Sequence, residues 1–313
     1  MKKLIPASAT VLLFLFSSIH AGGPGTTTAS FLKIGVGARN IGMGETGSIS
    51  EDVNGVYWNP AGIASLKEKE ISFMHAAWLE QINYEHLAFA MPMGAGAIGA
   101  AVNYLSMSPM ATYDKDGVKI ENETFTANDL AVTLSYGKSF SLSNARDMGL
   151  NIGVNLKYVS SSIEKESAAA LASDIGSQIK LKNGKIKFGL AVQNIGSGMK
   201  FKNETDPLPF NIKLGSAYTL MAGPSSPLLL AIDVNIPADN DARVNLGVEF
   251  IQKFGPLRLS PRVGYKTNTR GLEGLSGLTA GMGFNINTYC LDYAFVPYGL
   301  LGDTHRVSLS VKF

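Results

Sequence analysis

Apolar side chains alternate with small or polar ones from about residue 69 to the end of the chain. The end of the chain gives the clearest example, in which Val307, Leu309, Val311 and Phe313 alternate with Arg306, Ser308, Ser310 and Lys312. A period of two is the side-chain spacing of a β-strand whose two faces meet different surroundings. Each such segment therefore predicts a strand with one apolar face and one wet face.

About fourteen segments share this alternation. They cover residues 69–79, 82–92, 95–106, 127–139, 147–162, 168–181, 184–195, 209–221, 227–236, 241–253, 256–266, 276–286, 289–297 and 304–313. Most hold ~10 residues or more, longer than the ~5–6 usual in soluble sheets and matching the ~9–11 of a tilted membrane strand. An even count is also the rule for bacterial outer-membrane barrels. We therefore predict an all-β fold in which residues 68–313 form a transmembrane antiparallel β-barrel of about fourteen strands.

The connections between the predicted strands indicate how the barrel is oriented. If the first strand starts on the periplasmic side, inner turns such as 92–94 and 287–288 are short, and the outer connections include the longest, 107–126 and 196–208. Outer-membrane barrels have this asymmetry, and their aromatic girdles match the tyrosines that recur toward the predicted strand ends. The small polar face suits a crowded lumen. The alternative is a secreted β-sandwich, which would turn its apolar faces inward.

Residues 1–21 have the features of an export signal. Met1-Lys2-Lys3 gives a positive start, an apolar stretch runs from Val11 to Phe16, and small residues end at Ala21. This order predicts a secretory signal peptide cleaved after Ala21. A membrane-anchoring helix is the alternative, although the apolar run is shorter than the ~20 residues that a span requires. The expected location of the mature protein is the bacterial outer membrane.

Residues 22–67 do not alternate and are rich in glycine. A barrel of about fourteen strands is too wide for its own side chains to fill, since eight strands already leave room for a small ligand. Irregular backbone is tolerated inside a lumen but not facing lipid, and glycine permits close backbone approach. We therefore expect an N-terminal hatch inside the barrel, with Asn59, Pro60, Ala61 and Gly62 as its most distinctive motif.

Several charged residues fall on the predicted inward face of the strands. They include Asp174, Asp233, Arg243, Glu249, Arg258, Arg262, Asp292 and Arg306, together with Lys157, Lys213 and Lys266. A charge on the lipid face near the midplane is costly, so the inward phase is required wherever the strand is central. We expect these mixed charges to pair with one another and with Arg39, Glu45 and Asp52, and so to hold the hatch. Selection of a solute is the alternative role.

Composition limits the chemistry further. The chain is 45% hydrophobic and only 17% charged, and its formal net charge of +2 falls to zero without Lys2 and Lys3. A neutral mature protein gives no reason to expect a nucleic-acid partner. The single cysteine, Cys290, excludes a disulfide scaffold, and the scattered histidines and absence of hydrolase or zincin motifs argue against an enzyme. No cofactor and no metal are expected.

Two short motifs have ordinary structural readings. The G-x-G-x-x-G match at residues 42–47 lacks the following long helix that a dinucleotide site needs, so we interpret it as a close-packed turn. Asp114, Asp116 and Glu123 approximate the spacing of a calcium loop, but Asp116-Gly117 is better explained as a turn in an outer connection.

The chain also resembles a known family. The pieces that carry the resemblance are FLKIGVGARNIGMG from Phe31, Tyr57-Trp58-Asn59-Pro60-Ala61-Gly62, Ile82-Asn83-Tyr84-Glu85, Gln193-Asn194-Ile195-Gly196, Arg243-Val244-Asn245-Leu246-Gly247 and Leu291-Asp292-Tyr293-Ala294-Phe295. These resemble the PorV/PorQ family within the FadL-like superfamily of outer-membrane barrels. The resemblance implies a fourteen-stranded barrel with an N-terminal hatch. It also implies either a type IX secretion accessory that receives cargo or a transporter of hydrophobic molecules.

Two functional hypotheses and a set of partners follow. The first is a PorV-like, non-enzymatic component of protein secretion that meets secretion-system components or cargo through its outer loops. The second is a FadL-like transporter with a hydrophobic ligand, and a purely structural outer-membrane role is a third. In each case the barrel contacts outer-membrane lipid, and Phe313 is expected to be the C-terminal signal that the barrel-assembly machinery reads.

Overall fold

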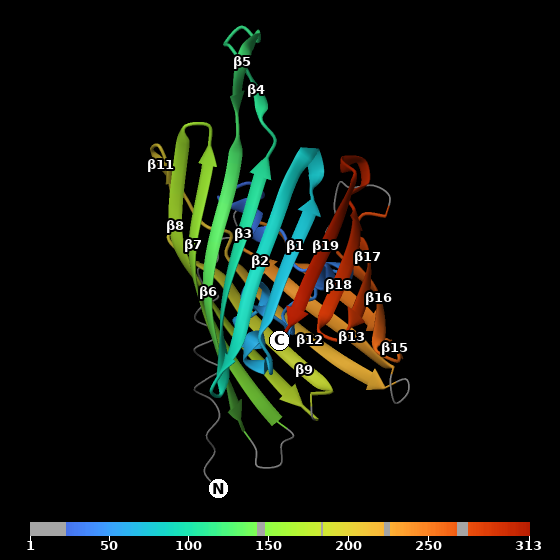
Figure 1. Cartoon of the computed structure of the whole chain (residues 1–313). Helices are drawn as coiled ribbons and strands as arrows, with labels where there is room; N and C mark the ends of the chain where they lie inside the picture. The colour runs from blue at the N-terminus through green and yellow to red at the C-terminus, as the bar shows by residue number, and fades with distance from the viewer. Residues whose placement is uncertain (1–22, 143–147, 183, 222–225, 268–274) are drawn as a thin grey trace, which may run out of the picture.

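The computed structural model describes residues 23–142, 148–182, 184–221, 226–267 and 275–313. One antiparallel sheet closes on itself as a barrel (Figure 1). Its strands are β1 (Glu70–Ala77), β2 (Ile82–Met93), β3 (Gly96–Met107), β6 (Ala127–Ser141), β7 (Met148–Ile163), β8 (Glu166–Leu181), β9 (Ile186–Gly196), β12 (Asn211–Met221), β13 (Pro227–Pro237), β14 (Arg243–Phe250), β15 (Gln252–Phe254), β16 (Leu257–Lys266), β17 (Leu278–Ile286), β18 (Tyr289–Pro297) and β19 (Asp303–Lys312).

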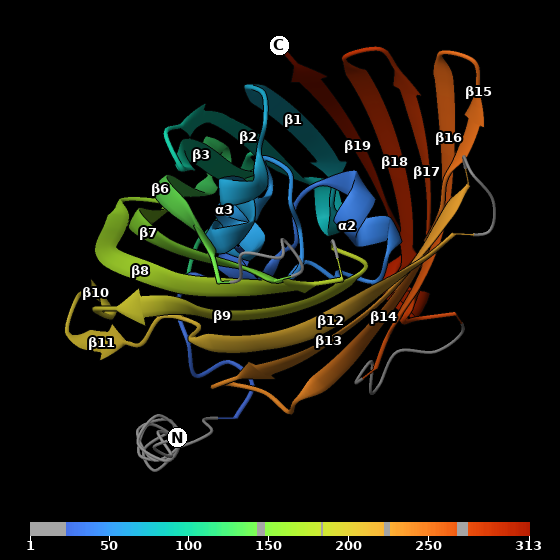
Figure 2. The same cartoon turned by 90° about the horizontal axis from the view of Figure 1, so that it is seen from below.

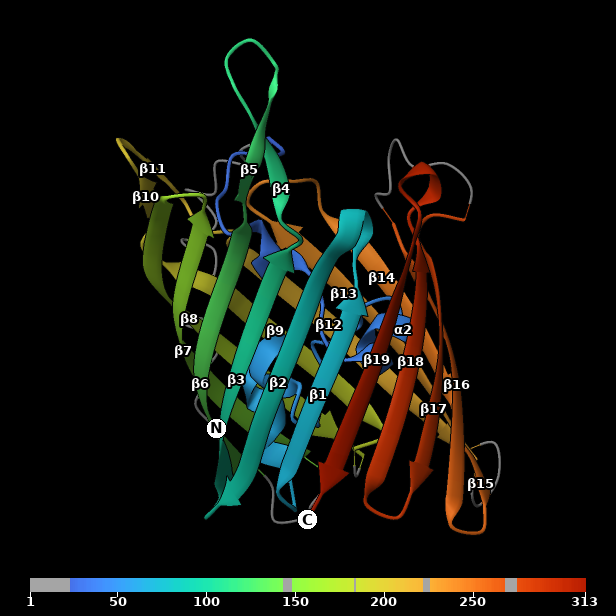
Figure 3. The same ribbon diagram turned by 45° about the horizontal axis from the view of Figure 1, so that its top comes forward.

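The first and last strands close the ring. β1 pairs with β19 from Glu70 opposite Lys312 to Ala77 opposite His305, and Figure 3 shows the two strands side by side. β15 continues β14 beyond Ile251, so fourteen strands make up the wall in the described residues. The predicted all-β class and strand count are confirmed. The segment predicted as one strand over 241–253 is interrupted at Ile251, where one residue leaves the ladder.

The burial pattern along the strands is inside out. On β6 and β7, Leu134 and Leu156 are 59% and 57% exposed on the outer surface, whereas Ser135 and Asn155 on the opposite face are buried. On β19 the outward Leu309 is exposed, and the inward Arg306 is completely buried. An apolar exterior around a polar interior is the arrangement of outer-membrane barrels and the reverse of a β-sandwich.

Two long connections contain hairpins that the alternation did not predict. β4 (Met110–Tyr113) pairs with β5 (Lys119–Phe125), and this hairpin projects beyond the rim of the barrel (Figure 1). β10 (Met199–Phe201) pairs with β11 (Glu204–Asp206) at the same end. Both hairpins are short, and their second strands, β5 and β11, are largely exposed on both faces, so the hairpins lack the one-sided pattern that marks the wall strands.

Residues 23–67, which we call the N-terminal segment, pack against the inner side of the wall. They form η1 (Ser30–Lys33), α2 (Ala38–Gly42), α3 (Gly55–Trp58) and η2 (Pro60–Ser65), and Figure 2 shows α2 and α3 enclosed by the ring of strands. η2 contacts β6, β7 and β8, while α2 contacts β17 and β18 on the other side. Two further 3₁₀ turns, η3 (Leu79–Gln81) and η4 (Gly299–Leu301), lie in the β1–β2 and β18–β19 connections.

Glycines in the wall allow this close approach. A Cβ added to Gly153 of β7 would lie 2.2 Å from the backbone carbon of Pro60, and one added to Gly176 of β8 would lie 2.0 Å from the side-chain oxygen of Asn59. Both distances are impossible for real atoms, so the backbone of η2 rests directly on the wall.

None of the helices in the described residues is long and apolar enough to cross a membrane.

Candidate functional site

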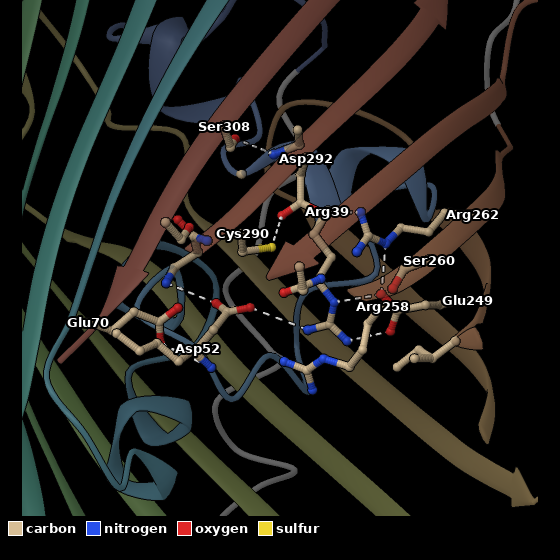
Figure 4. A pocket seen from close by; sticks show the side chains of 17 residues that line it. Arg39, Asp52, Glu70, Glu249, Arg258, Ser260, Arg262, Cys290, Asp292 and Ser308 are labelled. Carbon is tan, nitrogen blue, oxygen red and sulfur yellow. Dashed lines mark hydrogen bonds and ion pairs between the residues drawn. The ribbon is translucent and has the colours of Figure 1, made fainter. Parts of the chain in front are cut away.

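A chain of charged side chains connects α2 to the wall (Figure 4). The lining also includes Glu70 and Lys312, which lie at the end of the barrel where the strand turns are short. Arg39 binds Glu249 of β14 through two hydrogen bonds, with Nε–Oε1 at 2.9 Å and Nη2–Oε2 at 2.7 Å. Arg262 of β16 donates to the same carboxylate at 2.7 Å and to Asp292 of β18 at 2.6 Å. Asp52 accepts from Arg39 at 3.3 Å, which ties a second part of the N-terminal segment to the network.

This network borders a polar cavity of about 170 Å³. Arg258 lies at the same cavity with an exposed side chain and takes part in none of the ion pairs among the described residues. Cys290 donates its thiol to Asp292 at 3.2 Å, so it is held within the network. Attraction to Glu249 outweighs burial and raises the pKa of Arg39 well above its ordinary value, which keeps the guanidinium charged.

Two inward aspartates on other strands are fully buried, and each receives several donors. Asp233 of β13 accepts from Gly47 N at 2.8 Å, Ser48 N at 2.9 Å and Ser48 Oγ at 2.6 Å. Asp174 of β8 forms an ion pair with Lys157 at 2.7 Å and accepts the backbone N–H of Asn194 at 2.8 Å, at an irregularity in the β8–β9 register. Asp233 therefore fastens the N-terminal segment, whereas Asp174 completes the wall.

Glu45 joins the N-terminal segment to β16 and β14. Its carboxylate lies 2.8 Å from Lys266 and 3.8 Å from Arg243. Burial alone would raise the pKa of Glu45, but the positive charges of Lys266, Arg243 and Arg306 lower it from 4.5 to about 2. Glu51 behaves alike: burial opposes its ionisation, and Lys187 and Lys180 lower its pKa by ion pairing.

The Asn59-Pro60-Ala61-Gly62 motif lies at the start of η2 and is buried throughout. Asn59 accepts the N–H of Ala61 at 3.1 Å, which caps the 3₁₀ turn, and its amide donates to Ser48 at 2.7 Å and to Ser177 of β8 at 3.1 Å. A Cβ at Gly62 would lie 1.9 Å from the carbonyl oxygen of Ser50, so only glycine fits there. One asparagine thus fixes the turn, the segment and the wall together.

Arg306 forms no hydrogen bond or ion pair with these networks in the described residues, although its charge lowers the pKa of Glu45. Its guanidinium lies 4.9 Å over the ring of Trp78, and none of its three nitrogens has a hydrogen-bond partner in the part of the chain that the structure describes, although the residue is fully buried. Phe313 lies at the short-turn end, 61% exposed, with its ring stacked on Phe89 at 6.4 Å and its backbone paired with Lys69.

A second cavity, which we call the outer cavity, has a volume of about 240 Å³ at the end with the long connections. It lies between the N-terminal segment and strands β9, β12, β13 and β14, and it is lined in part by Asn211, Asn235, Asp239 and Arg243. Burial would raise the pKa of Asp239, but hydrogen bonds from Lys33 and Thr27 lower it. Arg243 and Lys213, which were expected to face inward, line this cavity, whereas the neutral Asn235 was not predicted from sequence.

Apolar side chains gather in the lumen beside these polar sites. A buried cluster joins Val36 and Trp58 of the N-terminal segment to Met74, Tyr84 and Val159 of the wall. The glycine-rich motif at residues 42–47 and the acidic motif near Asp114 both form turns, as expected. Gly44 has a φ of +68°, and Asp114 accepts the N–H groups of Asp116 and Val118, both at 2.9 Å. No group of three or more potential ligands in the described residues could hold a metal ion.

Comparison with known proteins gives one family and one group of folds. The family model "Type IX secretion system protein PorV" matches residues 24–237. Among solved structures, the Pseudomonas putida toluene transporter TodX is similar with a TM-score of 0.57 at 11% identity, covering 89% of this chain and 96% of that one. A FadL homologue of Pseudomonas aeruginosa is similar with a TM-score of 0.50 at 10% identity, covering 89% and 98%. A search of curated protein sequences found no match.

Proposed function

Because this chain belongs to the family of the type IX secretion protein PorV, we propose that it is a non-enzymatic outer-membrane accessory of protein secretion. The observation that carries the proposal is the family match, which spans the N-terminal segment and the wall from β1 to β13. The barrel fold shared with the toluene transporter TodX and the FadL homologue supports a location in the outer membrane. Residues 1–21, which lie outside the described part, would act as the signal peptide.

Exposed apolar side chains on the outer connections support an interaction role. Tyr113 and Val118 on the β4–β5 hairpin are 60% and 62% exposed, and Leu300 and Leu301 of η4 are 85% and 58% exposed. Lipid explains exposed apolar residues around the barrel wall, but these four lie in connections beyond the strands. Exposed apolar side chains on connections outside the wall strands are available for contact with another protein. Secretion-system components or cargo are the partners that we propose for this surface.

We further propose that the N-terminal segment is a hatch that blocks the lumen. Its backbone lies directly on wall glycines, and its carboxylates and Arg39 pair with buried charges of the wall. A well-held hatch suits an accessory that binds proteins at its outer surface, since such a role requires no open pore. Phe313 would be the terminal residue that the assembly machinery reads.

The proposal is tested by deletion and by a pair of loop variants in the native cell. Removal of the protein should leave secreted cargo trapped inside the outer membrane, and the tagged wild type should co-purify with secretion components. The double variant Tyr113→Ser and Val118→Ser should lose that co-purification while forming a normal barrel. Lys115→Ser, in the same hairpin, is the matched control and should behave like the wild type. Normal secretion in the deletion strain would overturn the proposal.

A transporter of hydrophobic molecules is the second candidate. Two observations favour it. The lumen contains a buried apolar cluster that includes Val36, Tyr84 and Val159, and the fold is similar to that of TodX. Under this reading, deletion would slow uptake of a probe such as toluene and leave secretion unchanged. The two candidates therefore give opposite results in the same strain.

A further inference from the structure

The outer cavity contains buried polar atoms that lack partners. Asn235 of β13 is fully buried, and among the described residues neither its amide nitrogen nor its amide oxygen has a hydrogen-bond partner. Asp239 is 2% exposed, and its Oδ1 also has no partner, although its Oδ2 is held by Lys33 at 2.6 Å and Thr27 at 2.5 Å. Buried polar groups are normally hydrogen-bonded, and leaving one unpaired costs ~1–3 kcal/mol.

Two further atoms at the cavity share this condition. They are the side-chain oxygen of Asn211 and the Nε of Arg243. The unpaired set therefore holds three acceptors, on Asn211, Asn235 and Asp239, and two donors, on Asn235 and Arg243. All of them belong to residues that line one space of about 240 Å³.

The mixture of donors and acceptors selects the chemistry of a ligand. An anion only accepts hydrogen bonds, so it would leave three acceptors unpaired beside the carboxylates of Asp239 and Glu45. A cation only donates, so it would leave the Asn235 amide nitrogen and the Arg243 Nε unpaired. A hydroxyl donates one hydrogen bond and accepts two at a single atom, so a few hydroxyls can satisfy the whole set.

The size and charge of the cavity favour a ligand with hydroxyl groups over one with peptide groups. Each peptide unit supplies a single N–H, so three unpaired acceptors would require three peptide units. A ligand of that size is large for this cavity, whose volume is below the ~300 Å³ of ordinary small-molecule sites. The charges at the cavity are nearly balanced, because Lys33 pairs with Asp239, and Arg243 lies 3.8 Å from Glu45. The fifth charged residue of the lining, Lys213, lies 3.9 Å from Asp233 of the wall. A neutral, compact molecule that carries several hydroxyls fits both conditions.

We propose that the outer cavity binds a single sugar unit through Asn235, Asn211, Asp239 and Arg243. The cavity lies at the end of the barrel with the long connections, which is the outer end in outer-membrane barrels, so the sugar is one that meets the protein from the cell exterior. This binding goes beyond the secretion role and does not depend on it.

The test uses the full-length barrel in a detergent without a sugar headgroup. Glucose, galactose, mannose and N-acetylglucosamine are titrated by calorimetry, and acetate and triglycine are titrated in parallel. At least one sugar should bind with one-to-one stoichiometry, and Asn235→Leu should weaken it at least ~10-fold, because both unpaired amide atoms are removed. Since these atoms have no partner in the empty protein, the variant should unfold at the wild-type temperature or above it. If Asn235→Leu does not assemble, Asn211→Leu carries the same expectation for affinity.

Asn103→Leu on β3 is the matched control. Asn103 is also a buried amide on the inner face, but it bonds His86 at 2.5 Å and does not line the outer cavity. This variant should lose stability and keep the sugar affinity of the wild type. The proposal is overturned if no sugar binds, if only acetate or triglycine binds, or if Asn235→Leu leaves the affinity unchanged. Failure to bind sugar would leave the secretion phenotype of the deletion strain unaffected, so the two proposals fail separately.

Discussion

Arg39 and Glu249 lie 210 positions apart in the chain and form a bidentate ion pair, with distances of 2.9 and 2.7 Å. Arg39 belongs to α2, and Glu249 projects inward from β14, where Arg262 also donates to its Oε1 at 2.7 Å. The Glu249 carboxylate is almost completely buried and therefore depends on both cations for its charge. The pair fixes the N-terminal segment to the wall at one defined point.

Replacement of Arg39 by Met should loosen the N-terminal segment without preventing barrel formation. The variant leaves Glu249 with one cation and Asp52 without its ion pair, which should cost ~2–4 kcal/mol of the segment's attachment. Limited proteolysis should then cut within residues 23–67, whereas the heat-modifiable migration of the barrel on gels should persist. Arg39→Lys keeps the positive charge but cannot form the bidentate pair of the guanidinium, so it should give an intermediate protease resistance. Equal protease resistance in all three proteins would contradict the role of this pair.

A methyl group added to the inner wall should displace η2. In Gly153→Ala the new Cβ would lie 2.2 Å from the backbone of Pro60, so the segment must shift, at a cost of ~1–3 kcal/mol. Gly149 lies on the same strand, and a Cβ there meets nothing within 4 Å, so Gly149→Ala is the matched control. Hydrogen exchange of η2 should accelerate in Gly153→Ala alone. Exchange that is equally slow in both variants would show that η2 does not rest on Gly153.

The contribution of Glu45 should depend on pH in one direction. Its pKa is about 2 in the folded protein against an ordinary value of 4.5, so the carboxylate binds protons more weakly when folded. A lowered pKa means that the stabilisation is complete above about pH 4.5 and is lost as the pH falls toward 2. The difference in unfolding free energy between wild type and Glu45→Gln should therefore be constant near neutrality and shrink across this window. A difference that grows on acidification would refute the assignment.

An outward-facing leucine should tolerate charge poorly. Leu134 lies at the middle of β6 and is 59% exposed, and Leu134→Arg should cost ~2–4 kcal/mol in a bilayer, as charges at the midplane do. In a water-soluble protein the same exposed substitution would change stability by only about 0.5 kcal/mol. Unfolding in lipid vesicles distinguishes the two values. Tyr113→Arg, in the projecting hairpin, is the control and should have almost no effect.

Loss of the terminal aromatic ring should reduce barrel assembly. Phe313 contributes little packing, since it is 61% exposed and stacks only on Phe89 at a centroid distance of 6.4 Å. Phe313→Ala should therefore lower the amount of assembled barrel in cells while leaving the unfolding temperature of the assembled fraction nearly unchanged. Phe89→Ala removes the same stacking contact and serves as the control. Normal amounts of Phe313→Ala in the membrane would argue against a terminal assembly signal.

The wall of the barrel could be predicted closely from sequence. Thirteen of the fourteen strands appear as continuous elements within a few residues of their predicted ranges, and the remaining one is divided at Ile251. The alternation is reliable because a wall strand meets lipid on one side and packed polar groups on the other along its whole length. The β4–β5 hairpin could not be found in this way, since both its faces meet solvent.

The candidate sites were predictable only in part. Strand phase places Glu249, Arg262 and Asp292 on the inner face, but it carries no information about which of them meet, or that Arg306 stays without a hydrogen bond. Neutral residues such as Asn235 gave no reason for attention, although they line the outer cavity.

The amino-acid sequence by itself thus determined the barrel, its strand count and its outward face, because hydrogen bonding between strands and exposure to lipid are repeated at every second residue. Only the tertiary structure decided how Arg39 finds Glu249, where Asn59 rests and which polar atoms surround the outer cavity. These contacts join an irregular segment to strands far away in the chain, and contacts of that kind leave no periodic trace in a sequence.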